Sequence, residues 1–224
     1  MSFLNNRWRS SLNALKGVEE LKIYQELEFC EIFFRIETKN RYRIKTTDGK
    51  LLLYAVEHSS FLCRWICRSY RPFRMSIYDM NGNEAVRMKR RLACTSCCCF
   101  PCCPLQRVQI FSPPKRFVGT VEERYRCWLP RFLVKNSAGK VIFEIKGPCY
   151  ASCPGASILA ADFKIFDLNG REVGRITKEW SGLLRELFTN SDFFALAFPK
   201  NLNKAKKAIL LSACFLIDFM YYEK

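Results

Sequence analysis

The sequence predicts a mainly β protein: a closed antiparallel barrel of two duplicated halves around a hydrophobic C-terminal helix. Three observations predict this fold class. Four segments each join two strand-like runs through a turn with glycine, the order of these segments repeats, and one long apolar run follows them. The chain has 224 residues, 49% of them hydrophobic, so it is long enough to bury a substantial core.

The four strand–turn–strand segments are the predicted hairpins. They are YRIKTTDGKLLLYAVE from Tyr42, FRMSIYDMNGNEAVRM from Phe73, FLVKNSAGKVIFEIKG from Phe132 and FKIFDLNGREVGRITK from Phe163. Their turn dipeptides are Asp48-Gly49, Asn81-Gly82, Ala138-Gly139 and Asn169-Gly170. Three of the dipeptides suit turns whose residues take positive φ, whereas Ala138 fits such a turn less well.

The order of landmarks predicts an internal duplication. The offset from Gly49 to Gly139 is 90 positions, that from Gly82 to Gly170 is 88, and that from Cys63 to Cys149 is 86. Strands rich in aromatic and β-branched residues need both sheet edges covered, and closure into a barrel removes the edges. A sandwich of two sheets is the alternative.

The C-terminal segment NKAKKAILLSACFLIDFMYYEK breaks the strand pattern and predicts a helix over residues 205–222. Its apolar run is about 15 residues, shorter than the roughly 20 that cross the hydrocarbon core of a bilayer. Because a helix that is apolar on all sides is normally buried, two placements stay open. Either the helix fills the barrel and Asp218 is a buried polar site, or the helix spans a membrane once, with a cytosolic N-terminus and Asp218 as an intramembrane site.

Residues 1–16 are predicted to be a lead-in to a single domain over residues 17–224. Leu4, Trp8, Leu12 and Leu15 recur at helical spacing, and Gly17 suits the end of a helix. The lead-in is therefore either an interfacial amphipathic helix or a frayed segment.

The charge balance predicts a polyanionic partner. Lys and Arg number 37 against 21 Asp and Glu, a formal net charge of +16, which suits an anionic membrane face or a nucleic acid. The start of the chain has no apolar signal-peptide core, and 13 cysteines in such a chain indicate reduced thiols in the cytosol. We therefore do not expect a disulfide framework.

The stretch RMKRRLACTSCCCFPCCP, residues 87–104, has the strongest functional signal. Its CxxC pairs are separated by one residue and no histidine lies nearby, so zinc or an iron–sulfur cluster fits poorly. Clustered thiols beside prolines suit S-acylation, and stable anchoring takes two signals, which the thiols and the preceding basic run supply. We expect Arg87, Lys89, Arg90 and Arg91 to contact anionic headgroups.

The sequence shows no Gly-rich phosphate loop and no strong motif for nucleophilic or acid–base catalysis. We therefore expect no enzyme with covalent chemistry. The SPPK segment at 112–115 is predicted to be a turn.

Five segments together closely resemble the phospholipid scramblase family. They are the cysteine run, GVEELKIYQELEF (17–29), GPC (147–149), GRITKEWSGL (174–183) and ACFLIDFMYYE (213–223). The resemblance extends over almost the whole chain from Gly17 onward. It implies a tubby-like barrel of about twelve strands around the C-terminal helix, and a protein on the cytoplasmic face of the plasma membrane. It also implies ATP-independent movement of phospholipids in both directions across the bilayer.

The resemblance further implies covalent palmitate in the loop 94–103, on Cys97, Cys98, Cys99, Cys102 and Cys103. Family members bind calcium weakly through an acidic segment before the C-terminal helix, which matches residues 190–201 here. This chain keeps only Asp192 among the expected carboxylates, with Asn190 and Asn201 where acids are usual. Since carboxylate number tunes calcium affinity, we expect weakened calcium binding and doubtful calcium control.

Two departures from the family pattern concern partners. The Pro-rich N-terminal segment that binds SH3 and WW domains in relatives is not found in this sequence, so those partners are not expected. GRITKEWSGL matches a segment used for importin-mediated nuclear entry, but Glu179 weakens its basic character and a hairpin strand explains it better. The alternatives to scrambling are a palmitoylated lipid-binding adaptor that recruits signalling proteins, and a DNA-binding regulator with a minor nuclear pool.

Overall fold

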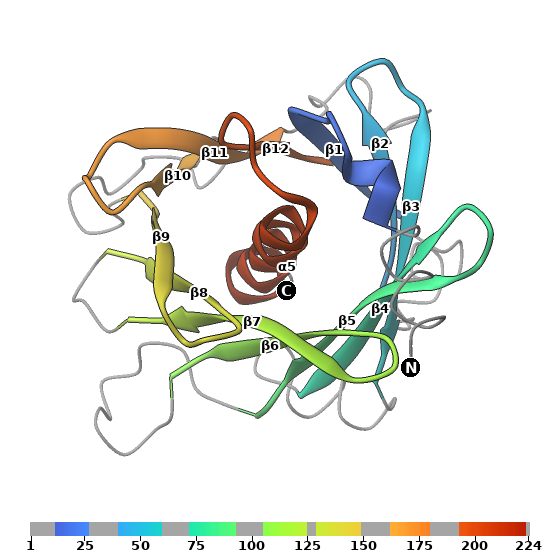
Figure 1. Ribbon diagram of the computed structural model, residues 1–224, viewed down its shortest axis with the longest axis horizontal. Coiled ribbons are helices and arrows are strands. Elements are labelled where there is room, and N and C mark those ends of the chain that lie inside the picture. The colour runs from blue at the N-terminus through green and yellow to red at the C-terminus, as the bar shows by residue number, and fades with distance from the viewer. Residues whose placement is uncertain are drawn as a thin grey trace.

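The fold is a closed barrel of twelve antiparallel strands with one α-helix inside it (Figure 1). The computed structural model describes residues 12–26, 40–59, 72–92, 105–124, 129–148, 162–179 and 193–222. Each strand pairs with its neighbours in the sequence, and β1 closes the ring on β12. The predicted barrel is confirmed, and the two-sheet sandwich is not what forms.

The first half of the barrel is built from six strands, and the short 3₁₀ helix η1 (Leu12–Leu15) precedes them. The strands are β1 (Glu20–Glu26), β2 (Arg41–Thr46), β3 (Leu51–His58), β4 (Phe73–Asp79), β5 (Glu84–Arg90) and β6 (Arg107–Ser112). The second half comprises β7 (Arg116–Glu123), β8 (Arg131–Asn136), β9 (Val141–Lys146), β10 (Asp162–Phe166), β11 (Glu172–Glu179) and β12 (Phe193–Ala197), followed by the helix α5 (Lys204–Tyr221).

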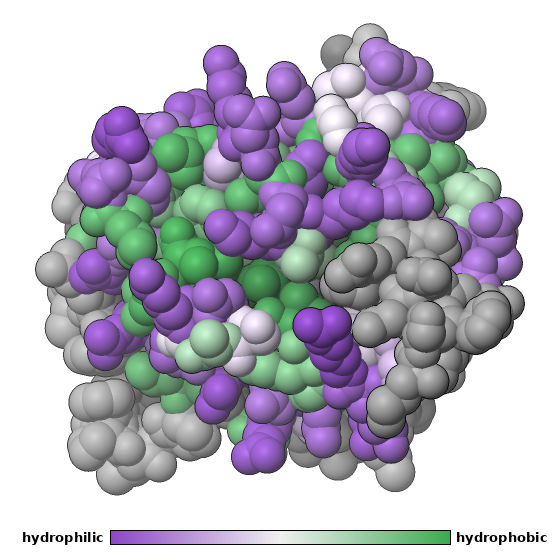
Figure 2. All heavy atoms as spheres, in the orientation of Figure 1, coloured by the Kyte–Doolittle hydropathy of each residue, from purple (hydrophilic) through white to green (hydrophobic). Residues whose placement is uncertain are grey.

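Alternation of side chains, interrupted at a few bulges, separates the inside of the barrel from the outside. In β2, Tyr42 and Ile44 are buried whereas Arg41 and Arg43 are exposed. The same period of two recurs around the ring, so the lysines and arginines of the strands mostly cover the outer wall. Figure 2, which looks at the face shown in Figure 1, shows hydrophobic residues at the middle of that face and hydrophilic ones around it.

The four predicted hairpins form, as β2–β3, β4–β5, β8–β9 and β10–β11. Only the glycine of each turn dipeptide takes positive φ, between 74° and 83°, and the residue before it does not. Ala138 is therefore unstrained, and the Asn136 side chain accepts hydrogen bonds from the backbone N–H groups of Ala138 and Lys140, both at 3.0 Å. This turn is therefore stabilised by Asx-type hydrogen bonds to the Asn136 side chain, which lies two residues before the dipeptide.

The C-terminal helix occupies the interior of the barrel. Side chains from Lys207 to Phe219 are all buried, and in Figure 1 α5 lies at the centre of the ring of strands. Asn203 caps its first turn, with the side-chain oxygen accepting from the Lys206 N–H at 2.9 Å. The sequence left two placements open for this helix, and the structure shows the first, in which the helix fills the barrel. Within the described ranges no helix is long and apolar enough to cross a bilayer.

Polar contacts hold both ends of α5. Near its start, the Lys207 ammonium donates hydrogen bonds to the backbone oxygens of Leu15 and Val18, just before β1. Near its end, the Tyr42 hydroxyl donates to Asp218 Oδ2 at 2.6 Å. Leu12 and Leu15, two residues of the expected N-terminal amphipathic face, are core residues at 1% and 0% exposure. Their apolar side chains face α5 rather than an interface; Leu4 and Trp8 lie outside the described residues.

Because all neighbouring strands are antiparallel, successive connections alternate between the two ends of the barrel. One end has the tight turns of the hairpins, including the β6–β7 turn with SPPK, as predicted. At the other end β5 finishes at Arg90 and β6 begins at Arg107. The predicted acylation loop 94–103 joins these two strands in the sequence and lies outside the described residues.

Candidate functional site

The basic run that ends β5 is divided between the two faces of the barrel wall. Arg87 and Lys89 point outward and are exposed, and Arg91 is exposed just beyond the strand. Arg90 is only 1% exposed, because the period of two turns it inward, where its Nε donates to Gln106 Oε1 at 2.7 Å. The expected headgroup contact therefore fits Arg87, Lys89 and Arg91, and is corrected for Arg90, which is a core residue.

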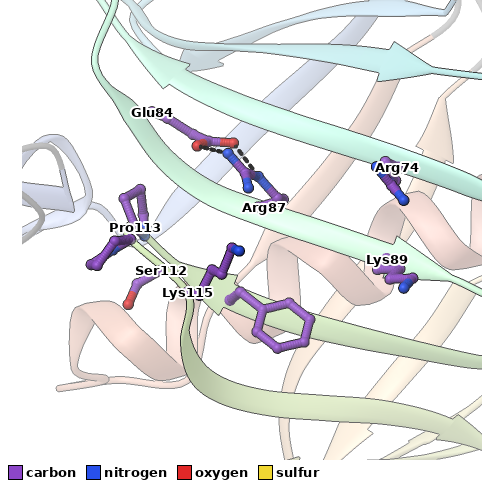
Figure 3. Close-up of a pocket in the computed structure, with 9 residues that line it drawn as sticks. Arg74, Glu84, Arg87, Lys89, Ser112, Pro113 and Lys115 are labelled. Carbon is purple, nitrogen blue, oxygen red and sulfur yellow. Dashed lines mark hydrogen bonds and ion pairs between the residues drawn. The ribbon is translucent and has the colours of Figure 1, made fainter.

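The outward residues of β5 line a cleft of about 540 Å³ on the outer wall (Figure 3). Four elements build it: β4, β5, the end of β6 and the turn between β6 and β7. Its lining consists of Arg74, Glu84, Arg87, Lys89, Phe111, Ser112, Pro113, Pro114 and Lys115. We call this site the basic cleft. Its volume falls in the range of small-ligand sites in proteins.

One cation of the basic cleft is already neutralised. Arg87 donates from Nε and Nη2 to the two carboxylate oxygens of Glu84, at 2.9 and 2.5 Å, and the Ser76 hydroxyl donates to Glu84 at 2.7 Å. The hydrogen bond to Glu84 raises the pKa of Arg87 above its usual value. This pair fixes the planar guanidinium along the wall of the cleft (Figure 3).

The other three cations have no counter-charge. Among the described residues, no carboxylate pairs with Arg74, Lys89 or Lys115, and all three side chains are exposed. Four cations against one carboxylate leave the cleft with a net charge of +3. Such a concave surface of one sign attracts anions.

Sequence reasoning found Arg87 and Lys89 but missed Arg74, Glu84 and Lys115. Arg74 is the second residue of the second predicted hairpin, and the period of two would have placed it on the outer face. Nothing in the sequence shows that the SPPK turn folds back beside β5, because that depends on the register between β5 and β6.

The described residues do not place the predicted calcium ligands Asn190, Asp192 and Asn201 next to one another. Asn190 and Asp192 lie outside the described residues. Asn201 follows the far end of β12, so the whole strand Phe193–Ala197 separates it along the chain from Asp192. Its backbone has a φ of 55°, in a turn that leads into α5. The described part of the chain contains no group of carboxylate, histidine and cysteine side chains that could hold a metal ion.

Asp218, predicted as a buried or intramembrane polar site, is buried in the barrel at 3% exposure. Besides Tyr42, Lys178 lies near it, with Nζ 4.0 Å from Asp218 Oδ1. One turn earlier on α5, burial raises the pKa of the Cys214 thiol well above its usual value, and the charge of Asp218 adds to this. Cys214 is therefore an inert core residue. The five predicted acylation cysteines lie outside the described residues.

The chain matches the Scramblase family model over residues 2–224. It is 40% identical over 213 residues to phospholipid scramblase 2 of Bos taurus, covering 95% of this chain and 71% of that protein. It is 39% identical over 214 residues to phospholipid scramblase 1 of Homo sapiens, covering 95% and 65%, respectively. Phospholipid scramblase family member 5 of Homo sapiens is 36% identical over 214 residues, with coverage of 95% and 77%. No solved structure matches the chain.

Proposed function

Since the chain belongs to the phospholipid scramblase family, we propose that it is a membrane-anchored scramblase that moves phospholipids between leaflets without ATP. The basic cleft supports this proposal most directly. It lies on the outer wall, where a phospholipid headgroup can reach it from the surrounding medium. The interior of the barrel is filled by α5, so the lipid path follows the outside of the barrel. No covalent bond forms or breaks in such a transfer.

Anchoring to the cytoplasmic face of the plasma membrane uses two signals. Palmitate on Cys97, Cys98, Cys99, Cys102 and Cys103 provides the first. The exposed cations Lys89 and Arg91 provide the second, each contributing about 1 kcal/mol near an anionic leaflet, whereas the charge of Arg87 is paired with Glu84. One acyl chain alone holds a protein only marginally, whereas an acyl chain with a polybasic patch anchors it stably.

Calcium binding is proposed to be weak. The segment 190–201 contributes a single carboxylate, Asp192, and calcium takes six to eight oxygen ligands. The position of Asn201 beyond β12 supports a site without this residue. Calcium stimulation of transport should accordingly need concentrations well above those of a high-affinity sensor.

The test is a dithionite-quench assay on proteoliposomes that contain a fluorescent phospholipid, with and without calcium. Loss of clearly more than the outer-leaflet half of the fluorescence is expected for wild type, without ATP. A quench that stops at one half, with protein verified in the vesicles, contradicts autonomous scrambling. For anchoring, metabolic labelling with a palmitate analogue should label wild type and lose the signal when the five cysteines are changed to Ser.

A second function is supported by the filled barrel. With α5 packed against the inner wall, the described strands and helix form one packed core whose outer surface is left to bind lipid. A palmitoylated adaptor that binds headgroups and recruits signalling proteins needs only this surface. Vesicle binding without any transfer of lipid in the dithionite assay supports the adaptor function.

A further inference from the structure

We propose that residues 12–18 form a strap, caught by the Lys207 ammonium, that retains α5 in the barrel and that can open while the sheet stays closed. The strap consists of η1 and the chain that leads from it to β1. It is not a strand of the barrel, so its hold on α5 depends on side-chain contacts and not on the ladder of the sheet. This inference goes beyond lipid transport and does not rest on it.

The apolar side chains of the strap are buried against the helix. Leu12 and Leu15 are 1% and 0% exposed, and η1 contacts both α5 and β3. In Figure 1, η1 is the short blue helix that lies between β3 and α5. After it, Gly17 takes a φ of 75°, which few other residues adopt, and turns the chain toward β1. The strap thus bridges the barrel wall and α5, with a hinge at its end.

The polar groups of the strap receive the cations of the first turn of α5. The Lys207 ammonium donates to the backbone oxygen of Leu15 at 3.0 Å and to that of Val18. The Lys204 ammonium donates to the side-chain oxygen of Asn13. The first turn of the helix and the strap are therefore joined by charge-assisted hydrogen bonds as well as by apolar contact.

The burial of Lys207 makes the docking of α5 conditional on the strap. Its side chain is 5% exposed, and burial lowers its pKa, although the charge of Glu19 acts in the opposite direction. A buried ammonium that loses its acceptors is strongly destabilising, so opening the strap draws Lys207 toward water. The ring of Phe198, 5.3 Å from the ammonium, does not replace the two carbonyl oxygens. Because Lys207 begins the buried run of α5, its movement loosens the start of the helix.

The far end of α5 is held by the strands themselves. The Tyr42 hydroxyl binds Asp218, and the ring of Phe73 stacks on that of Phe219 with centroids 4.2 Å apart. Tyr42 and Phe73 belong to β2 and β4, so these contacts do not depend on the strap. Opening of the strap should therefore release α5 from its start while the sheet stays closed.

The thiol of Cys214 reports on this opening. It lies midway along α5 and is 1% exposed, so it is protected as long as the helix stays in the barrel. The test is labelling of the full chain with N-ethylmaleimide in solution, without lipid. Trypsin then releases residues 208–224, in which Cys214 is the only cysteine, so mass spectrometry of this peptide separates its label from those on the other cysteines.

The strap variant is Leu12→Ala/Leu15→Ala. The control variant, Ile165→Ala/Ile176→Ala, removes two equally buried aliphatic side chains from β10 and β11, away from η1 in Figure 1. The strap variant should label Cys214 at least about 10-fold faster than wild type. Its rate should change little with urea below the unfolding transition, because opening the strap exposes little surface. The rate of the control variant should rise steeply with urea, because labelling there requires global unfolding.

A strap variant that labels Cys214 as slowly as wild type would overturn the proposal. Acceleration with the urea dependence of the control variant would also overturn it, since Leu12 and Leu15 would then only add to global stability. If the double variant does not fold, Leu15→Val tests the same contact; it should accelerate labelling at least about 3-fold, and an unchanged rate refutes the strap. The assay contains no lipid, so its outcome is independent of the dithionite assay of scrambling.

Discussion

The hydroxyl of Tyr42 offers a precise test of how α5 is held in the barrel. It donates a 2.6 Å hydrogen bond to the carboxylate of Asp218, and both residues are buried. The two positions are 176 residues apart in the sequence, so the bond exists only if the C-terminal half of α5 is docked against β2. Tyr42→Phe removes the hydroxyl and keeps the ring, which packs edge-on against Phe215 at 4.9 Å.

The expected cost follows from the chemistry of the acceptor. Hydrogen bonds to charged groups contribute about 1.5–3 kcal/mol, so we expect Tyr42→Phe to lower the free energy of unfolding by about 2 kcal/mol. In a domain of this size, about 2–4 °C of melting temperature is lost per kcal/mol, which gives a decrease of about 4–8 °C.

The assay is urea unfolding followed by circular dichroism, with Tyr24→Phe as the matched control. Tyr24 also packs against a phenylalanine ring, that of Phe193 at 4.9 Å, but its hydroxyl has no hydrogen-bond partner among the described residues. The control should change the free energy of unfolding by less than about 0.5 kcal/mol. If Tyr42→Phe is as mild as Tyr24→Phe, the hydroxyl does not bind a buried carboxylate and the docking of α5 is refuted.

Three further predictions concern the packing of the barrel. Lys207→Met should cost about 1–2 kcal/mol in urea unfolding, because two backbone oxygens lose their donor, whereas Lys206→Met should be nearly neutral. Gly119→Ala should cost about 2 kcal/mol by overpacking, since the new Cβ would clash with the backbone oxygen of Lys135 on β8 and would lie 2.7 Å from Ile209 Cδ1 of the helix; a neutral result would contradict this close packing around Gly119. Hydrogen bonds from backbone N–H groups of its own turn lower the pKa of the Asp167 carboxyl, so its stabilisation is present above its usual pKa and lost as pH falls through the lowered one. The difference in urea midpoint between wild type and Asp167→Ala should therefore be present at pH 7 and shrink toward zero below the lowered pKa.

The sequence was sufficient to predict the hairpins and the helix because these depend on local signals. Glycines at Gly49, Gly82, Gly139 and Gly170 mark the turns, and all four take the positive φ that the prediction required. The apolar run of the C-terminal segment predicted a buried helix, which the structure places between Lys204 and Tyr221.

The functional surface was only partly predictable, because it depends on register and on the direction of side chains. The sequence of the basic run 87–91 does not distinguish its cations, yet the period of two along β5 buries Arg90 and exposes Arg87 and Lys89. The opposition of Arg74 to Lys89 follows from the exact pairing of β4 with β5, and the approach of Lys115 follows from the β6–β7 turn. Such long-range neighbours leave no pattern along the chain.

Phospholipid is proposed to meet the outer wall of the barrel and not the helix inside it. Photocrosslinking in vesicles with a phospholipid that carries a diazirine tests this directly, since trypsin releases residues 208–224 of the chain as one peptide that reports on α5. Residues 75–87 and 108–115, which contribute to the basic cleft, form separate tryptic peptides. Lipid adducts on the two cleft peptides and none on 208–224 are the predicted result. Adducts on 208–224 would show that the helix leaves the barrel to meet lipid and would contradict a lipid path along the outer wall.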